Sequence, residues 1–207
     1  MKYDKIFVIG NNKTGTKSFN SLFNCLGLRS QHDRKSWDFD KYTCFTDGFH
    51  DEKKFIQYDE AFKNSLFILN TRPLDHWLKS KSKYAYINKS RGQWPPKSKQ
   101  YIEYINQRDK HFNDILNYFN DKNDRLLICN IEAINWENFI KENIRPKNLK
   151  NYNVHENKID ESSIDPEAMK LINEELNKAY EYLNYTEESK IKLLPDNQYT
   201  FLYKQNL

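Results

Sequence analysis

The sequence has few cysteines, no long apolar run and little net charge. Its three cysteines, Cys25, Cys44 and Cys129, are an odd number without metal-ligand spacing. Because each lies in an apolar segment, they predict buried, reduced thiols rather than a disulfide framework or a metal site. The formal net charge is only +4, with 33 basic and 29 acidic residues, which argues against a dedicated nucleic-acid-binding protein.

The N-terminal segment lacks the features of a targeting sequence. Residues 2–5 are polar and precede a short apolar stretch that is too small for a signal sequence or a membrane span. We therefore expect a soluble, cytoplasmic protein. The 207 residues show no internal repeat, and this length fits a single domain over residues 1–207, with 165–207 a C-terminal helix and tail packed on it.

Apolar spacing along the chain predicts strands alternating with helices. Strands are predicted at 6–9, within 41–50, at 65–70 and at 125–130; helices are predicted through 19–26 and at 51–64, 74–86, 98–119, 135–141 and 165–183. Residues 29–40, 88–97 and 143–164 are expected to be polar or irregular. This alternation indicates an α/β class: a three-layer fold whose central, mostly parallel sheet is flanked by helices. Aromatic residues, 15% of the chain, are expected to dominate the core.

The most informative segment follows the first strand and reads Gly10-Asn11-Asn12-Lys13-Thr14-Gly15-Thr16-Lys17-Ser18. It resembles a Walker A loop, which surrounds a nucleotide's phosphates with backbone N–H groups. The match fails at one position, because Thr16 stands where the Lys should follow Gly15, and Lys13 comes earlier. The alternative is an ordinary strand-to-helix turn with a solvated Lys.

The residues after this loop predict an amphipathic helix. Phe19, Leu22, Phe23 and Leu26 share one face, and Gly27 closes the run. A phosphate at the start of this helix would meet N–H groups without intrahelical partners and the positive end of the helix dipole.

A second phosphate-binding candidate lies after the strand at 65–70. Arg72 follows that strand, and Ser80 stands eight residues later. In a helix from Leu74 onward, Ser80 lies about two turns in, and its hydroxyl can face the same crevice as the Arg72 guanidinium. An Arg and a hydroxyl suit a phosphate monoester. Otherwise, Arg72 is a salt-bridge partner.

These segments together resemble the P-loop sulfotransferases that use 3′-phosphoadenosine 5′-phosphosulfate (PAPS), especially small bacterial-type members. Lys13-Thr14-Gly15-Thr16-x-Ser18 is similar to their 5′-phosphosulfate loop, and the pair Arg72 and Ser80 is similar to their 3′-phosphate site. The similarity continues at 45–47, 126–136 and 152–158, and covers about residues 4–160. Lys17 differs from the family's common second Thr in the loop.

The resemblance implies a P-loop fold and transfer of a sulfuryl group from PAPS to a hydroxyl or amine, without a metal ion. Lys13 would stabilise the charge developing on the bridging oxygen. The 3′-phosphate would be held by Arg72 and Ser80. The resemblance assigns the remaining cofactor contacts to Lys13, Thr14, Gly15, Thr16, Lys17, Ser18 and Lys158.

The acceptor's proton needs a general base, which in this family is a His or a carboxylate near the end of an early strand. Asp47 and His50 are the candidates, and the position of Asp47 in Phe45-Thr46-Asp47 favours it. The alternatives stay open at this stage: Asp47, before Gly48, is otherwise a turn residue, and His50 a surface residue.

The acceptor is expected to be a small molecule or a carbohydrate. The residues of its pocket form no sequence motif that would identify it. Either an acceptor lid or a plain surface loop is expected around the loop at 88–97, from Tyr84, Tyr86, Arg91 and Trp94. The run at 79–83 is either a solvated face or attracts an anionic cofactor. Trp77 and Trp136 are expected in the core.

Two other functions compete with sulfuryl transfer. A small-molecule kinase using a nucleoside triphosphate predicts Lys directly after Gly15 and a strand-end Asp for Mg²⁺, where the chain has Asn70 and Asn130. A degenerate nucleotide-binding or interaction protein predicts loss of Lys13, Arg72 or Ser80, and all three are present. Both rank below the sulfotransferase hypothesis.

Overall fold

The computed structural model describes residues 2–32, 36–48, 53–88, 94–122, 124–134, 136–144, 164–185 and 199–201. Its contacts divide the chain into two compact units. Unit 1 comprises Met1–Thr71, Phe112–Asn157 and Leu194–Leu207, and unit 2 comprises Arg72–His111 and Lys158–Leu193. The expectation of one domain over 1–207, with 165–207 packed on it, stays a prediction.

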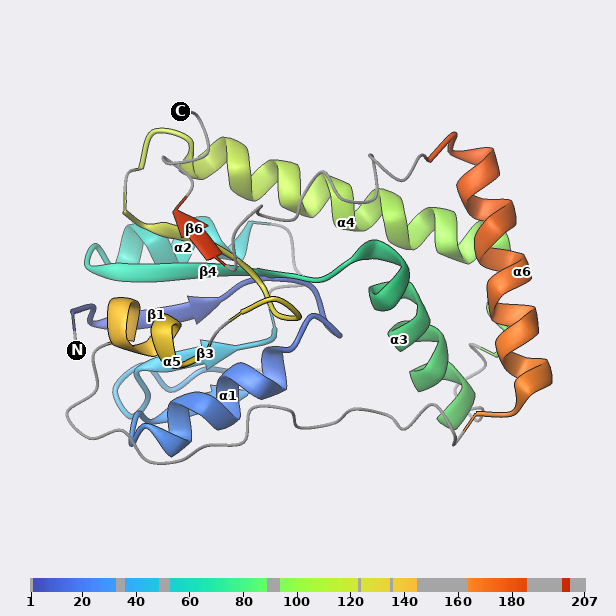
Figure 1. Ribbon diagram of the computed structural model, residues 1–207. Coiled ribbons are helices and arrows are strands. Elements are labelled where there is room, and N and C mark those ends of the chain that lie inside the picture. Colours follow the sequence, from blue (N-terminus) through green and yellow to red (C-terminus); the bar gives the residue numbers. More distant parts are fainter. Residues whose placement is uncertain are drawn as a thin grey trace. The chain divides into compact units, whose positions relative to one another are not determined.

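Unit 1 is built around a six-stranded sheet in the order β2-β3-β1-β4-β5-β6 (Figure 1). Its strands are β1 (Lys5–Val8), β2 (Ser30–His32), β3 (Cys44–Thr46), β4 (Ser65–Thr71), β5 (Leu126–Asn130) and β6 (Tyr199–Phe201). The first five strands in this order are parallel, and β6 joins the edge antiparallel to β5. The predicted α/β class with a mostly parallel sheet is confirmed.

The order of the strands explains why helices cover both faces. The chain leaves β1 in one direction through α1 (Thr16–Cys25), and it crosses the sheet in the opposite direction from β3 through α2 (Lys54–Ala61) to β4. Because such crossovers are right-handed, opposite directions place their helices on opposite faces. Figure 1 shows α1 and α5 (Trp136–Phe139) on one side of the sheet and α2 on the other.

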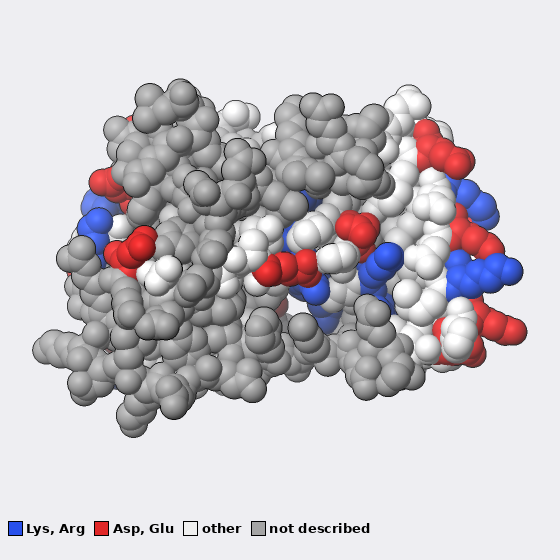
Figure 2. Space-filling model, viewed as in Figure 1, with Lys and Arg blue, Asp and Glu red and all other residues white. Residues whose placement is uncertain are grey.

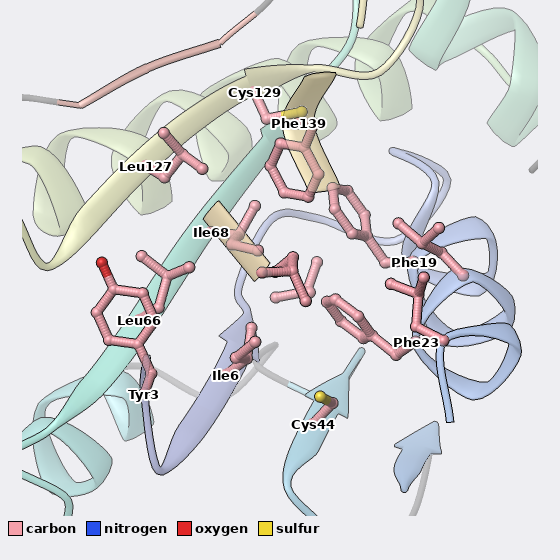
Figure 3. Packing of buried hydrophobic residues seen from close by; sticks show 14 of the residues in the cluster. Tyr3, Ile6, Phe19, Phe23, Cys44, Leu66, Ile68, Leu127, Cys129 and Phe139 are labelled. Carbon is pink, nitrogen blue, oxygen red and sulfur yellow. The ribbon is translucent and has the colours of Figure 1, made fainter. Parts of the chain in front are cut away.

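Alternate residues of β1 serve the two faces. Ile6 and Val8 face α1, are completely buried and belong to an aliphatic and aromatic core cluster. Figure 3 shows Phe19 and Phe23 of α1, with Phe139 of α5, pointing into this cluster. Phe19 and Phe23 are completely buried, so the predicted apolar stripe of this helix is confirmed.

The opposite face is aromatic. The ring of Phe7 stacks on Phe45, Tyr58 and Phe67, with centroids 5.3, 5.3 and 5.1 Å away. Phe119, at the C-terminal end of α4 (Ser98–Phe119), packs on Phe67 at 4.9 Å. This face bears out the expectation that aromatic side chains fill much of the core.

Two short strands and one cysteine depart from the sequence-based expectations. Ser30–His32 was expected to be polar coil, yet β2 pairs in parallel with β3, and Ser30 and Gln31 are buried. The strand at 199–201 was also missed. Cys44 and Cys129 are buried as predicted, but Cys25 is exposed, because it lies on the outer side of the last turn of α1.

Unit 2 contains α3 (Leu74–Ile87), the first part of α4 and α6 (Pro166–Tyr182). Trp77 is 2% exposed and lies in a cluster formed by these helices, so its predicted core position is confirmed. Asp165 caps α6 by accepting a hydrogen bond from the Glu167 N–H at 2.9 Å. Acidic and basic side chains alternate along the outer side of α6 (Figure 2).

None of the helices within the described ranges is long and apolar enough to cross a membrane. The longest, α4, spans 22 residues and carries charged side chains along its length.

Burial of Tyr101 in unit 2 predicts a dependence of stability on alkaline pH. Its hydroxyl lies 2.5 Å from Ser82 Oγ, and burial raises the pKa of Tyr101 to about 12. An unfolded Tyr ionises near pH 10, so at higher pH the unfolded state holds fewer protons than the folded state. The free energy of unfolding therefore falls as the pH rises from about 10 toward 12.

We expect the change Tyr101→Phe to reduce this alkaline loss of stability by about 1.4 kcal/mol at pH 11. Urea unfolding at pH 8 and pH 11 measures it, and the pH-independent loss of the Ser82 contact cancels in the difference. Tyr182→Phe is the matched control, because Tyr182 is 74% exposed and should leave the pH dependence unchanged. An equal alkaline loss in the wild type and Tyr101→Phe would contradict this prediction.

Candidate functional site

The β1–α1 loop, residues 9–15, is held by one side chain from the neighbouring strand β4. Asn70 Oδ1 accepts a hydrogen bond from the Gly10 N–H at 2.8 Å. Asn70 Nδ2 donates to the Thr14 carbonyl oxygen and to Thr14 Oγ1, both at 2.7 Å. Asn70 is completely buried, and Thr14 is 1% exposed. One amide therefore fastens both ends of the loop to the sheet.

The close approach of the loop to β4 requires glycine at position 10. A Cβ there would lie 2.2 Å from the Asn70 carbonyl oxygen and 2.4 Å from Asn70 Oδ1. Backbone and side chain would both have to move to admit it. Gly10 thus makes room for the three hydrogen bonds between Asn70 and the loop, which we call the clamp. The spacing between Gly10 and Gly15 in the sequence does not reveal this role.

The loop ends in two left-handed backbone positions on either side of Thr14. Lys13 has φ 67° and Gly15 has φ 88°. Such alternation turns successive N–H groups toward a common point, which is how backbone concavities bind anions. Gly15 also lies against Ile131, whose Cδ1 would be 2.8 Å from an added Cβ.

The start of α1 presents donors and positive charge. Its first N–H groups have no intrahelical acceptor, and the N-cap residue, Gly15, has no side chain that could cap them. The first turn carries no acidic residue, although acidic residues are favoured there, and it carries Lys17 instead. The positive end of the helix dipole and its N–H groups favour an anion at this position.

The predicted cofactor residues of the loop therefore come together in unit 1. Thr16 is 4% exposed, Ser18 is half-buried and Lys17 is exposed. Asn11 Nδ2, in the same loop, is a buried donor that has no hydrogen-bond partner in the described part of the chain. A bound anion offers acceptors to such a donor.

The other predicted cofactor residues lie elsewhere. Arg72 follows β4 directly, and Ser80 lies in the second turn of α3; both are half-buried members of unit 2. The helix expected to carry Ser80 is confirmed. Lys158 and His50 lie outside the described residues, as does Arg91.

The basic run on α3 is only partly a solvated face. Lys83 is 7% exposed, and Lys81 Nζ lies over the rings of Trp77 and Tyr104, 5.0 and 4.1 Å from their centroids. The aliphatic stems of these lysines thus pack within unit 2. Trp94 packs edge-on against Tyr86 at 4.9 Å.

Asp47, a predicted base, forms a pair with a histidine that the sequence did not single out. Asp47 Oδ2 lies 3.8 Å from His32 Nε2, and each side chain is 15% exposed. His32 Nδ1 lies 2.8 Å from Thr46 Oγ1. Asp47 has φ 69°, and its Oδ1 accepts a hydrogen bond from the Gly48 N–H at 3.0 Å. Asp47 is thus both a turn residue and a neighbour of the His32 side chain.

The pair lies at the carboxyl ends of the parallel strands, as the β1–α1 loop does. Val8, Thr46 and His32 are in register across β1, β3 and β2. Since neighbouring strands are about 4.8 Å apart, His32 is roughly 10 Å from the end of β1. β2 is polar and only three residues long, so it leaves no periodic signal in the sequence. For that reason the sequence does not identify His32 as a residue at a strand end.

Within the described ranges, His, Cys, Asp and Glu side chains form no group of three that could hold a metal ion. Compared with known proteins, the chain matches no family model, no curated protein and no solved structure.

The clamp makes a testable prediction about stability. Asn70→Asp keeps an acceptor for Gly10 but replaces the donor to Thr14 by a carboxylate oxygen that faces two other oxygens. We expect a loss of about 3 kcal/mol in the free energy of unfolding, because buried groups lose their partners. Chemical denaturation at neutral pH measures this loss.

Asn64→Asp is the matched control, because Asn64 is exposed just before the same strand. It introduces the same charge and should change the free energy of unfolding by less than about 0.5 kcal/mol. Equal stability of the Asn70→Asp and Asn64→Asp proteins would show that the clamp does not support the fold.

Proposed function

We propose that the protein is a cytoplasmic sulfotransferase that moves the sulfuryl group of PAPS to a hydroxyl or amine and releases adenosine 3′,5′-bisphosphate. The observation that carries the proposal is the β1–α1 loop: a braced, glycine-containing turn with Lys13 before Gly15, leading into a helix whose N-cap residue is Gly15. This arrangement suits a doubly charged phosphate ester.

In the proposed reaction the acceptor oxygen or nitrogen attacks sulfur in line with the bridging oxygen. A bond forms from the acceptor to sulfur, the bond from sulfur to the bridging oxygen breaks, and the acceptor's proton passes to a base. Negative charge collects on the 5′-phosphate as it leaves. Lys13 and the N–H groups at the start of α1 are positioned at one loop and would stabilise that charge.

The proposal assigns the 3′-phosphate to Arg72 and Ser80. A guanidinium can make two parallel hydrogen bonds to a phosphate, and a hydroxyl can add a third. The acceptor is proposed to be a small molecule or a carbohydrate.

The side chains at the strand ends favour this reading over a kinase. Asn70, which stands where a kinase would place a metal-binding Asp, uses both of its amide atoms to hold the loop. Asn130 Oδ1, at the end of β5, accepts a hydrogen bond from the Glu132 N–H at 3.1 Å. The position after Gly15, which a kinase fills with Lys, holds a buried Thr16.

Calorimetric titration with three ligands tests the proposal. We expect the wild-type protein to bind adenosine 3′,5′-bisphosphate more tightly than adenosine 5′-monophosphate, and ATP with Mg²⁺ most weakly. Binding of ATP with Mg²⁺ alone would contradict the sulfotransferase proposal and support the kinase.

Variants locate the two phosphates. Arg72→Ala should weaken bisphosphate binding by about 10- to 100-fold, because one charged hydrogen-bonding group is lost, and should leave monophosphate binding nearly unchanged. Lys13→Ala should weaken both ligands alike, since both carry the 5′-phosphate. Arg29→Ala, at an exposed position, is the matched control and should bind as the wild type does. An Arg72→Ala protein that keeps the full preference for the bisphosphate would refute the assigned role of Arg72.

A further inference from the structure

The backbone on both sides of Trp37 is held by one side chain of β2. Gln31 is 8% exposed. Its Oε1 accepts a hydrogen bond from the Asp38 N–H at 3.0 Å, and its Nε2 donates to the Ser36 carbonyl oxygen at 3.2 Å. A single amide thus fixes Trp37 from both of its neighbours, much as the amide of Asn70 fixes both ends of the β1–α1 loop.

A side chain of β1 holds the rest of the same segment, residues 36–42. Lys5 Nζ donates to the carbonyl oxygens of Phe39 and Tyr42, at 2.5 and 2.8 Å. The ammonium also lies 5.9 Å from the centroid of the Phe45 ring, and the face of an aromatic ring attracts a cation. The segment is therefore fastened to the sheet along its length.

This anchoring places the Trp37 ring at the carboxyl end of β3. A Cβ added at Gly48 would lie 3.3 Å from Trp37 Cζ2 and 3.8 Å from its Nε1, so one edge of the indole faces Gly48. The ring also stacks on Phe45 at 4.9 Å and on Tyr58 at 5.2 Å. Phe45 is completely buried, whereas Trp37 is half-buried and keeps part of its surface accessible to solvent.

The turn that Trp37 borders and the β1–α1 loop follow neighbouring strands. Val8 of β1 is in register with Thr46 of β3, and Gly10 and Gly48 each come two residues later. Neighbouring strands are about 4.8 Å apart, and ligands of parallel sheets bind beyond the carboxyl ends of the strands. An acceptor that reaches a sulfuryl group at the loop from the side of β3 therefore passes the Gly48 backbone and the Trp37 ring.

From this arrangement we infer that Trp37 is a specificity-determining residue that forms one wall of the acceptor site, and that Gln31 is a positioning residue that holds it there. This inference rests on the proposed function. An indole offers a flat apolar surface, and a ring that is already fixed loses little conformational entropy on binding. A flat ring covers more of such a surface than a short flexible chain does. The acceptor is therefore a hydroxyl compound built on a ring, a phenol or a sugar.

Steady-state kinetics with three acceptors test this inference. PAPS is supplied with 4-nitrophenol, with methyl β-glucoside or with 1-butanol, which has no ring, and release of adenosine 3′,5′-bisphosphate is measured. We expect the wild-type kcat/KM to be about tenfold higher for one of the ring acceptors than for 1-butanol. The preferred ring then tells whether the acceptor is a phenol or a sugar.

Variants of Trp37 test whether its ring is the wall. Trp37→Ala should raise the KM for the preferred ring acceptor about tenfold, because the stacking contact and the buried apolar area are lost. Its kcat and its affinity for adenosine 3′,5′-bisphosphate should stay within about threefold of wild type. Trp37→Phe, which keeps a smaller ring, should give an intermediate KM. Phe39→Ala is the matched control, since it removes another half-buried ring of the same segment, and its KM should equal that of the wild type.

A double-mutant comparison tests the role of Gln31. Gln31→Met keeps the length of the side chain but loses both hydrogen bonds to the segment. It should raise the KM for the ring acceptor about threefold in the wild-type background and should have no further effect in Trp37→Ala, because it acts through the indole ring. The same rise in both backgrounds would show that Gln31 only supports the fold.

Other results would overturn the assignment of Trp37. An unchanged KM in Trp37→Ala, or an equal rise in Phe39→Ala, would show that the ring is only part of the core. Weaker binding of the bisphosphate to Trp37→Ala would place the ring beside the donor instead. A wild-type protein that binds the bisphosphate but uses 1-butanol as well as the rings, or uses none of the three acceptors, would refute this inference and leave the donor assignment standing. If the wild type binds no bisphosphate, the proposed function fails, and the inference fails with it.

Discussion

The three hydrogen bonds of the Asn70 side chain are the interaction on which the site depends. They join β4 to both ends of the β1–α1 loop and fix its path. Gly10 is needed because the loop passes so close to Asn70, and the left-handed turns at Lys13 and Gly15 follow within the same short span. A loop shaped in advance loses little conformational entropy when an anion binds.

The sheet order places this clamp where an α/β fold offers a crevice. The chain leaves β1 toward β2 and leaves β4 toward β5, so the connections diverge between these neighbouring strands. Ligands in open α/β sheets bind outside the strand ends at such a divergence. Asn70 spans it, and the pair of His32 and Asp47 occupies the ends of the next two strands on one side.

Much of the scaffold could be predicted from the sequence, because its signals are local. The apolar stripe of α1, the buried run of β4 and the 22-residue helix α4 each carry a strong pattern, and the last matched residue for residue. The strand β2 could not be found this way, since Ser30, Gln31 and His32 are polar and become a strand only by pairing with β3. The clamp cannot be found this way either, because Asn70 lies 56 residues from Thr14 and no local pattern relates the two.

A crystal structure of the chain with adenosine 3′,5′-bisphosphate tests the proposed role of the β1–α1 loop most directly. We expect the 5′-phosphate to lie against the backbone N–H groups of Gly15–Ser18, with the hydrogen bonds between Asn70 and both Gly10 and Thr14 retained. A 5′-phosphate bound away from the β1–α1 loop, or a loop that releases Asn70 when the nucleotide binds, would contradict it.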